Sequence, residues 1–131
     1  MDEYWVNKAH QYISEHASFS DVSDIEYSAD TCSAVIQALA IVGLPASSLE
    51  RGETPQGVRP REPITFIFRE DFPLCAPLIL LRDDFPRTFP HINPSEKRVI
   101  PCIYDGTLSE LLQQSEWMNG VLNQLAEWLE K

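Results

Sequence analysis

The chain has 131 residues, of which 44% are hydrophobic, and its 20 Asp and Glu against 10 Lys and Arg give a net charge of −10. This length and apolar content suffice for one domain with a buried core. The negative charge repels nucleic-acid phosphates and anionic membranes, so it argues against both as partners and favours a protein with a basic surface. No stretch reaches the ~18 apolar residues that a membrane helix needs.

The three cysteines, Cys32, Cys75 and Cys102, are far apart in the sequence. Their odd number and the absence of a CxxC pair argue against a disulfide framework. No Cys/His group has the spacing of a zinc site, and there is no phosphate-binding loop, so we expect neither a metal nor a cofactor. The acidic N-terminus lacks the apolar region of a signal peptide. We therefore expect a cytoplasmic protein in a reducing setting.

The first third of the chain predicts a helix followed by two strand regions. Apolar residues at i, i+4 and i+8 predict an amphipathic helix over residues 4–16. Partial alternation over residues 17–30 predicts an irregular edge strand. The apolar run 34–44 is compatible with a helix, but its β-branched residues and the following Gly43 and Pro45 favour a strand.

The middle of the chain is punctuated by proline. Residues 45–63 hold several Pro and Gly residues and predict a long loop. Short strands are predicted at 64–68 and 78–81, with a proline-rich turn at 69–77 between them. Residues 83–101 contain four prolines and no sustained periodicity, so we expect an ordered irregular segment, which in a compact domain is usually functional.

The C-terminal part predicts a short helix at 108–112 and a final helix at 117–129, whose apolar residues repeat at 3.6 spacing. The final pattern continues to Lys131 without a Gly or Pro stop signal, so we expect residues 1–131 to be one domain at the N-terminal part of a longer polypeptide. A helix, about four consecutive strands, a long structured loop and further helices indicate the α+β class, with an antiparallel meander and segregated helices.

Cys102 is the cysteine whose surroundings favour a chemical role. It follows the proline-rich segment and precedes Ile103-Tyr104-Asp105-Gly106, a turn signal that predicts exposure of the thiol. An accessible thiol can attack a thioester and carry the acyl group, and this needs no triad. The alternative is a buried structural cysteine, the usual fate of a free thiol. Cys32 and Cys75 adjoin apolar segments, and we expect both to be small core residues.

Several motifs occur in the order found in ubiquitin-conjugating enzymes. Residues 72–77, Phe-Pro-Leu-Cys-Ala-Pro, resemble the family's Tyr-Pro-x-x-Pro-Pro element, and 78–81 resemble the strand that follows it. His91-Ile92-Asn93 resembles the His-Pro-Asn motif. Cys102 stands where the catalytic cysteine belongs, and Trp117 resembles a later family tryptophan. The resemblance covers about half of the chain by motif and the rest by the order of elements.

The departures from the common pattern point to a divergent bacterial type. Ile92 replaces the motif's proline, Pro101 precedes the cysteine, and the distance from Cys102 to Trp117 is longer than usual. The chain is similar to the bacterial domains that are fused to, or encoded beside, a ubiquitin-activating-like adenylyltransferase, as in the antiphage system CBASS. This resemblance implies an enzyme that accepts an activated protein C-terminus as a thioester on Cys102 and transfers it to an amine on a target.

The resemblance also implies roles for three residues near the cysteine. Asn93 would order the loop and stabilise the oxyanion formed during aminolysis, although Asn-Pro is also a common turn pair. His91 is expected to brace the loop by hydrogen bonding rather than to act as a base. Asp105 would orient the incoming amine. Asp-Gly is also an ordinary turn pair, and a plain turn is the favoured interpretation of this residue. Trp117 and Trp128 fall on the apolar face of the last helix, which favours core packing.

The implied partners are an adenylyltransferase, either separate or fused in the same chain, an acyl donor and a target protein. The donor is a ubiquitin-like protein or the C-terminus of a nucleotide cyclase. The first helix of the eukaryotic family is basic and docks the activating enzyme, whereas residues 2–30 here are acidic with Lys8 as their only Lys or Arg, so docking is expected to differ. Two alternatives stay open: a catalytically inactive binding module like the RWD domains, and an unrelated α+β adaptor whose acidic face binds a basic protein.

Overall fold

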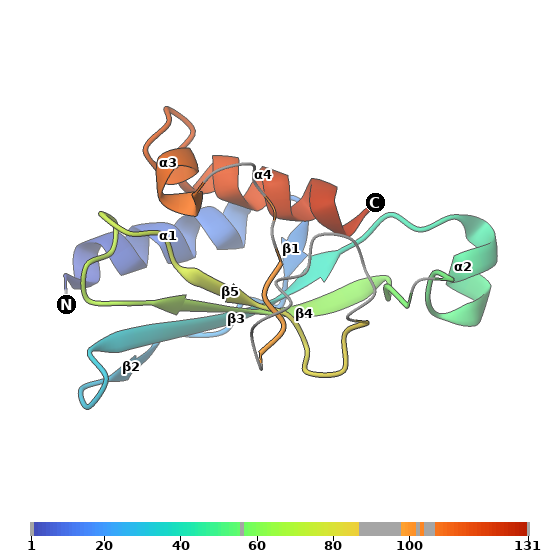
Figure 1. Cartoon of the computed structure of the whole chain (residues 1–131), viewed down its shortest axis with the longest axis horizontal. Helices are drawn as coiled ribbons and strands as arrows, with labels where there is room; N and C mark the ends of the chain where they lie inside the picture. The colour runs from blue at the N-terminus through green and yellow to red at the C-terminus, as the bar shows by residue number, and fades with distance from the viewer. Residues whose placement is uncertain (1, 56, 87–97, 102, 104–106, 131) are drawn as a thin grey trace.

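The computed structural model describes residues 2–55, 57–86, 98–101, 103 and 107–130. Its elements follow the predicted order of a helix, strands and further helices, which confirms the α+β class (Figure 1). The elements are α1 (Glu3–Glu15), β1 (Phe19–Ser20), β2 (Glu26–Ser28), β3 (Ser33–Ile41), α2 (Ala46–Arg51), β4 (Arg61–Phe68), β5 (Leu78–Leu80), α3 (Leu108–Leu112) and α4 (Met118–Leu129).

Helix α1 forms where the apolar periodicity predicted it. The Asp2 carboxylate caps its N-terminus by accepting a hydrogen bond from the Tyr4 backbone N–H at 3.1 Å. Val6, Ala9 and Ile13 are its buried residues, and their spacing of three and four places them on one face. These three residues form the buried stripe of the helix, and Trp5 and Tyr12 are partly buried against the core.

The sheet is built around β3. This strand pairs antiparallel with β4 over eight residue pairs, from Ala34 opposite Phe68 to Ile41 opposite Arg61. Strand β5 extends the sheet beyond β4, and the predicted edge segment contributes two short strands, β1 and β2, that both pair with β3. Asp21, between β1 and β2, has a positive φ of 52°, which interrupts the edge strand. The sheet thus has five strands in place of the expected four or so.

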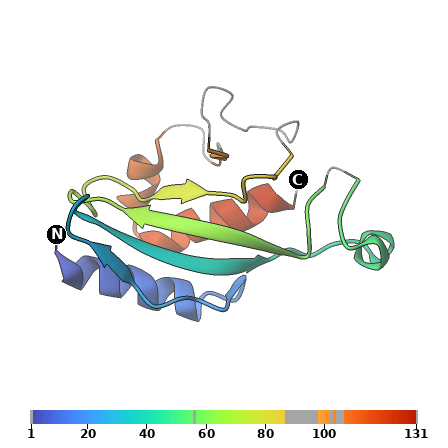
Figure 2. The same cartoon turned by 90° about the horizontal axis from the view of Figure 1, so that it is seen from below.

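One face of this sheet forms the core. Alternate residues of the two long strands are buried, and on β4 they are Glu62, Ile64, Phe66 and Phe68. Helices α1, α3 and α4 lie on one side of the sheet, and the view from below shows no helix over the opposite side in the part of the chain described (Figure 2).

Among the described residues, no helix has the length and apolar character needed to cross a membrane.

The prediction of a loop over residues 45–63 is wrong in two places. It contains helix α2, whose six residues bury only Ser48 and so give no apolar stripe in the sequence. Gly52 ends this helix in the left-handed conformation, with φ 82°. Strand β4 also begins at Arg61, three residues before the predicted start, because Pro63 is accommodated opposite Leu39 although proline suggested a loop.

Strand β3 ends at Ile41, three residues before the predicted end, whereas β5 and the last two helices form within one residue of their predicted bounds. Helix α3 has the predicted bounds, and α4 begins one residue later than predicted. Within the irregular segment 83–101, residues 83–86 and 98–100 form neither helix nor strand, and residues 87–97 lie outside the described part of the chain.

The packing of α4 on the sheet predicts a large difference between two matched leucine substitutions. Leu122 of α4 is fully buried, whereas Leu49 of α2 is 54% exposed. We expect Leu122→Ala to lower the free energy of unfolding by about 2–5 kcal/mol, and Leu49→Ala to change it by less than about 0.5 kcal/mol. Urea unfolding followed by circular dichroism measures both values. Equal effects of the two substitutions would contradict this packing.

Candidate functional site

The four predicted catalytic residues, Cys102, Asn93, His91 and Asp105, lie outside the described residues. Their assignment stays a prediction, and the site is defined here by the described residues that flank it. These flanks are the end of β5 with the segment that follows it, residues 98–101, Ile103 and helix α3.

The residues on either side of Cys102 are buried. Pro101 is buried, Ile103 is 7% exposed, and Val99 is fully buried. The backbone N–H of Leu81 donates a hydrogen bond to the carbonyl of Val99 at 2.9 Å. The chain leading into Cys102 is therefore attached to the sheet at the point where β5 ends, which fixes the path of the backbone before the cysteine.

Helix α3, which follows the predicted cysteine, is attached to the proline-rich turn. The Ser109 hydroxyl accepts a hydrogen bond from the Ala76 backbone N–H at 3.0 Å. The Gln113 side-chain amide donates to the Pro73 carbonyl, also at 3.0 Å. The turn that resembles the family's proline element therefore holds the chain after Cys102. Leu74, at the tip of this turn, is 79% exposed.

A buried ion pair lies beside the segment after β5. Glu62 is fully buried on the core face of β4, and its carboxylate accepts two hydrogen bonds from the Arg82 guanidinium, at 2.8 Å from Nε and 3.1 Å from Nη2. The Arg59 backbone N–H donates a further bond to the same carboxylate at 2.7 Å. The pKa of Arg82 is raised above its ordinary value, mainly by the hydrogen bond to Glu62. The contacts therefore leave neither the carboxylate nor the guanidinium without a hydrogen-bond partner.

The sequence analysis missed this pair, although part of the signal was present. Glu62 alternates with Ile64 and Phe66, so the period of two already places a carboxylate among the buried residues of a strand. Its partner Arg82 is 20 residues further along the chain, in a segment without periodicity. No local pattern connects two such positions.

The expectation that Cys32 and Cys75 are core residues is wrong for Cys32 and only partly right for Cys75. Cys32 is exposed in the turn between β2 and β3, where its φ is 48°. Cys75 is half-buried and borders a cavity of about 580 Å³ together with Thr31, Arg69 and Asp71. Both cysteines adjoin apolar strands in sequence, but each lies in a turn outside the strand, so the neighbouring apolar residues say nothing about its burial.

Cys75 is poorly suited to nucleophilic chemistry. The pKa of its thiol is raised above the ordinary value, first by a hydrogen bond to Asp71, then by burial and by the negative charge of Asp71, with Arg69 acting in the opposite direction. The thiol therefore stays protonated at neutral pH, and the thiolate is the reactive form.

Among the residues described, no group of three or more His, Cys, Asp or Glu side chains could hold a metal ion.

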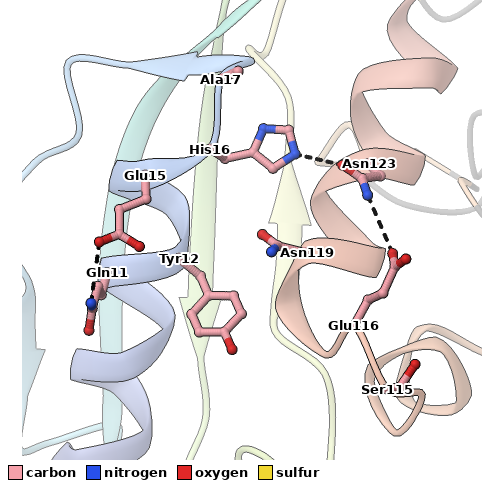
Figure 3. Close-up of a pocket in the computed structure, with 9 residues that line it drawn as sticks. All are labelled: Gln11, Tyr12, Glu15, His16, Ala17, Ser115, Glu116, Asn119 and Asn123. Carbon is pink, nitrogen blue, oxygen red and sulfur yellow. Dashed lines mark hydrogen bonds between the residues drawn. The ribbon is translucent and has the colours of Figure 1, made fainter.

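A groove of about 850 Å³ lies between α1 and α4 (Figure 3). His16 and Asn123 meet across it. The His16 Nδ1 accepts the Ser18 backbone N–H at 3.1 Å, so its Nε2–H donates to the Asn123 side-chain oxygen at 2.7 Å. The Asn123 amide in turn donates to Glu116 at 3.5 Å. The His16–Asn123 bond ties the end of the first helix to the last helix.

The two C-terminal tryptophans pack as expected for core residues, but in different places. Trp128 is 1% exposed on α4. Trp117 is the N-cap residue of that helix, with φ 50°, rather than part of its apolar face. The Trp117 ring centroid lies 5.1 Å from that of Tyr12, 5.8 Å from that of Phe72 and 6.0 Å from that of Trp5. It therefore joins α1 to the proline-rich turn.

Comparison with known proteins gives one family match. The family described as prokaryotic E2 family A matches residues 9–131, a range that contains every candidate residue, the second half of α1 and all described elements from β1 onward. No curated protein and no solved structure shows a significant match.

The raised pKa of Cys75 predicts its reactivity. In a chain whose other two cysteines are replaced by serine, we expect the midpoint of the pH profile for alkylation of Cys75 by iodoacetamide to lie above that of an ordinary thiol. Asp71→Asn replaces the charged acceptor by a neutral amide, which removes the negative charge that raises the pKa and weakens the hydrogen bond, so the midpoint should move to lower pH. Glu70→Gln is the matched control, because this neighbouring carboxylate is not a cause of the shift. Equal midpoints for both variants would refute the role of Asp71.

Proposed function

The chain belongs to prokaryotic E2 family A, and from this we propose that it is a ubiquitin-conjugating-type acyltransferase whose nucleophile is Cys102. The observation that carries the proposal is the family match, which runs through residues 9–131 and includes this cysteine. The buried neighbours Pro101 and Ile103 support it further, because they hold the backbone on both sides of the thiol.

The proposed reaction has two steps. The Cys102 thiolate attacks the thioester carbonyl on the activating enzyme; a C–S bond to Cys102 forms, the C–S bond to the activating enzyme breaks, and the released thiolate takes up a proton. A target amine then attacks the new thioester, an amide bond forms, and Cys102 leaves as the thiolate while the amine loses a proton. Asn93 would stabilise the oxyanion of this second step, His91 would brace its loop, and Asp105 would orient the amine.

The other cysteines are weaker candidates. The pKa of Cys75 is raised, so little thiolate forms at neutral pH. Cys32 lies in the turn before β3, at the end of the sheet where β5 begins, whereas Val99 is bonded to Leu81 where β5 has ended. Neither position coincides with the segment that resembles the family's active site.

Membership in an E2 family implies an activating enzyme and a ubiquitin-like protein as partners in general. We further propose that the activating enzyme is an adenylyltransferase, either fused to this chain or separate. The donor would be a ubiquitin-like protein or the C-terminus of a nucleotide cyclase, and the reaction would serve antiphage defence of the CBASS type. An inactive binding module of the same fold is the second candidate, and the observation that favours it is Ile92 in place of the family's proline.

A loading assay tests the proposal. The protein is mixed with the adenylyltransferase, ATP and the donor, and the products are separated on non-reducing gels. We expect an adduct that thiol reductants remove, present in wild type and in Cys32→Ala and absent in Cys102→Ala. Cys32→Ala is the matched control because it removes a cysteine whose exposure the structure describes.

Two outcomes would contradict the proposal. An adduct that persists in Cys102→Ala would place the acyl group on another residue. The absence of any adduct in wild type, with an adenylyltransferase shown to adenylate the same donor, would favour the binding module.

A further inference from the structure

The buried ion pair of Glu62 and Arg82 joins β4 to the segment that follows β5. Burying two charges costs nearly as much as their attraction returns, so such a pair adds little to folding compared with well-packed apolar residues. We propose that Arg82, held by Glu62, is a positioning residue: it fixes the chain beside Leu81, whose bond to Val99 anchors the residues that precede Cys102. This inference rests on the proposed function of Cys102 and deepens it.

Arg82 joins three segments that are separate in sequence. Its Nη2 donates to the Gly57 carbonyl at 2.6 Å, in the loop before β4. Its Nε and Nη2 bind Glu62 on β4 itself. Its Nη1 forms an ion pair with Asp84 at 3.2 Å, and Asp84 also pairs with Arg59 at 3.5 Å. A planar guanidinium can serve all these acceptors at once, whereas a lysine ammonium cannot.

The segment after β5 is held at further points by its apolar residues. The Arg82 guanidinium lies 5.3 Å from the centre of the Phe85 ring, which stacks on Trp128 of α4 at 6.0 Å. Pro86 rests against Gly57, where a Cβ would come within 2.5 Å of the proline ring. Gly57 also has a φ of 93°, which only glycine adopts readily.

Both flanks of the segment between β5 and Cys102 are thereby fixed. Residues 81–86 are held by the Arg82 contacts and by the stacking of Phe85, and the end of the segment is bonded to the sheet through Val99 and Leu81. Arg82 itself need not touch the reacting atoms. Its effect on Cys102 passes through Leu81 and the bond from Leu81 to Val99, and for that reason it is a positioning residue rather than a catalytic one.

The test separates geometry from stability by replacing the pair as a unit. In a Cys32→Ser/Cys75→Ser background, E62L/R82M exchanges the ion pair for apolar side chains, a change that often leaves stability intact. Leu122→Ala, a destabilising change on α4, is the control. For each variant the thermal midpoint, the rate of Cys102 alkylation by N-ethylmaleimide and the rate of thioester loading are measured at a temperature where all are folded.

We expect E62L/R82M to load at least about tenfold more slowly than the background chain, with an altered alkylation rate and a preserved thermal midpoint, because small misplacements of a reacting group reduce rates strongly. Leu122→Ala should lower the midpoint but keep both rates. Loading and alkylation by E62L/R82M at background rates would overturn the inference.

Failure of the proposed function is distinguishable from failure of this inference. If the background chain itself does not load with an active adenylyltransferase, the proposed function fails. The alkylation rates, which need no partner, still show whether the pair sets the presentation of Cys102. If E62L/R82M does not fold, Arg82→Lys takes its place, with slowed alkylation expected and an unchanged rate contradicting the inference.

Discussion

The antiparallel pairing of β3 with β4 is the constraint on which the rest of the structure depends. Its eight-pair register sets which side chains of β4 face the core, and so places Glu62 in line with Ile64 and Phe66. A shift by one residue would turn every one of these side chains to the opposite face. Strand β5 pairs with the other edge of β4, and the end of β5 is where the chain toward Cys102 is attached.

From this sheet outward, hydrogen bonds hold the described residues on both sides of the predicted nucleophile. Before Cys102, the ion pair of Glu62 and Arg82 and the bond from Leu81 to Val99 attach the chain to the sheet. After Cys102, α3 is bonded to the proline-rich turn. The chemistry of acyl transfer asks for one accessible thiol on a fixed backbone, and the described flanks supply the fixed backbone.

The sequence predicted the features that repeat locally and missed those that depend on distant contacts. Apolar periodicity was enough for α1 and α4, since each buries a regular set of residues, and β-branched residues followed by Gly43 and Pro45 were enough for β3. Helix α2 was missed because its only buried residue is Ser48, and Cys32 was misplaced because apolar neighbours do not reveal which way a turn faces. The pairing of Glu62 with Arg82 spans 20 residues and leaves no local trace. The candidate residues around Cys102 rest on motif resemblance and stay predictions.

The central claim is that the acyl group is carried by Cys102 and by neither of the other two thiols. The most direct measurement is alkylation protection read by peptide mass spectrometry after incubation with the adenylyltransferase, ATP and donor. The account predicts that the Cys102 peptide escapes alkylation until hydroxylamine releases the acyl group, while the exposed Cys32 is alkylated throughout and Cys75 reacts at the same rate with and without donor. Protection of Cys32 or Cys75 with Cys102 fully alkylated would contradict it.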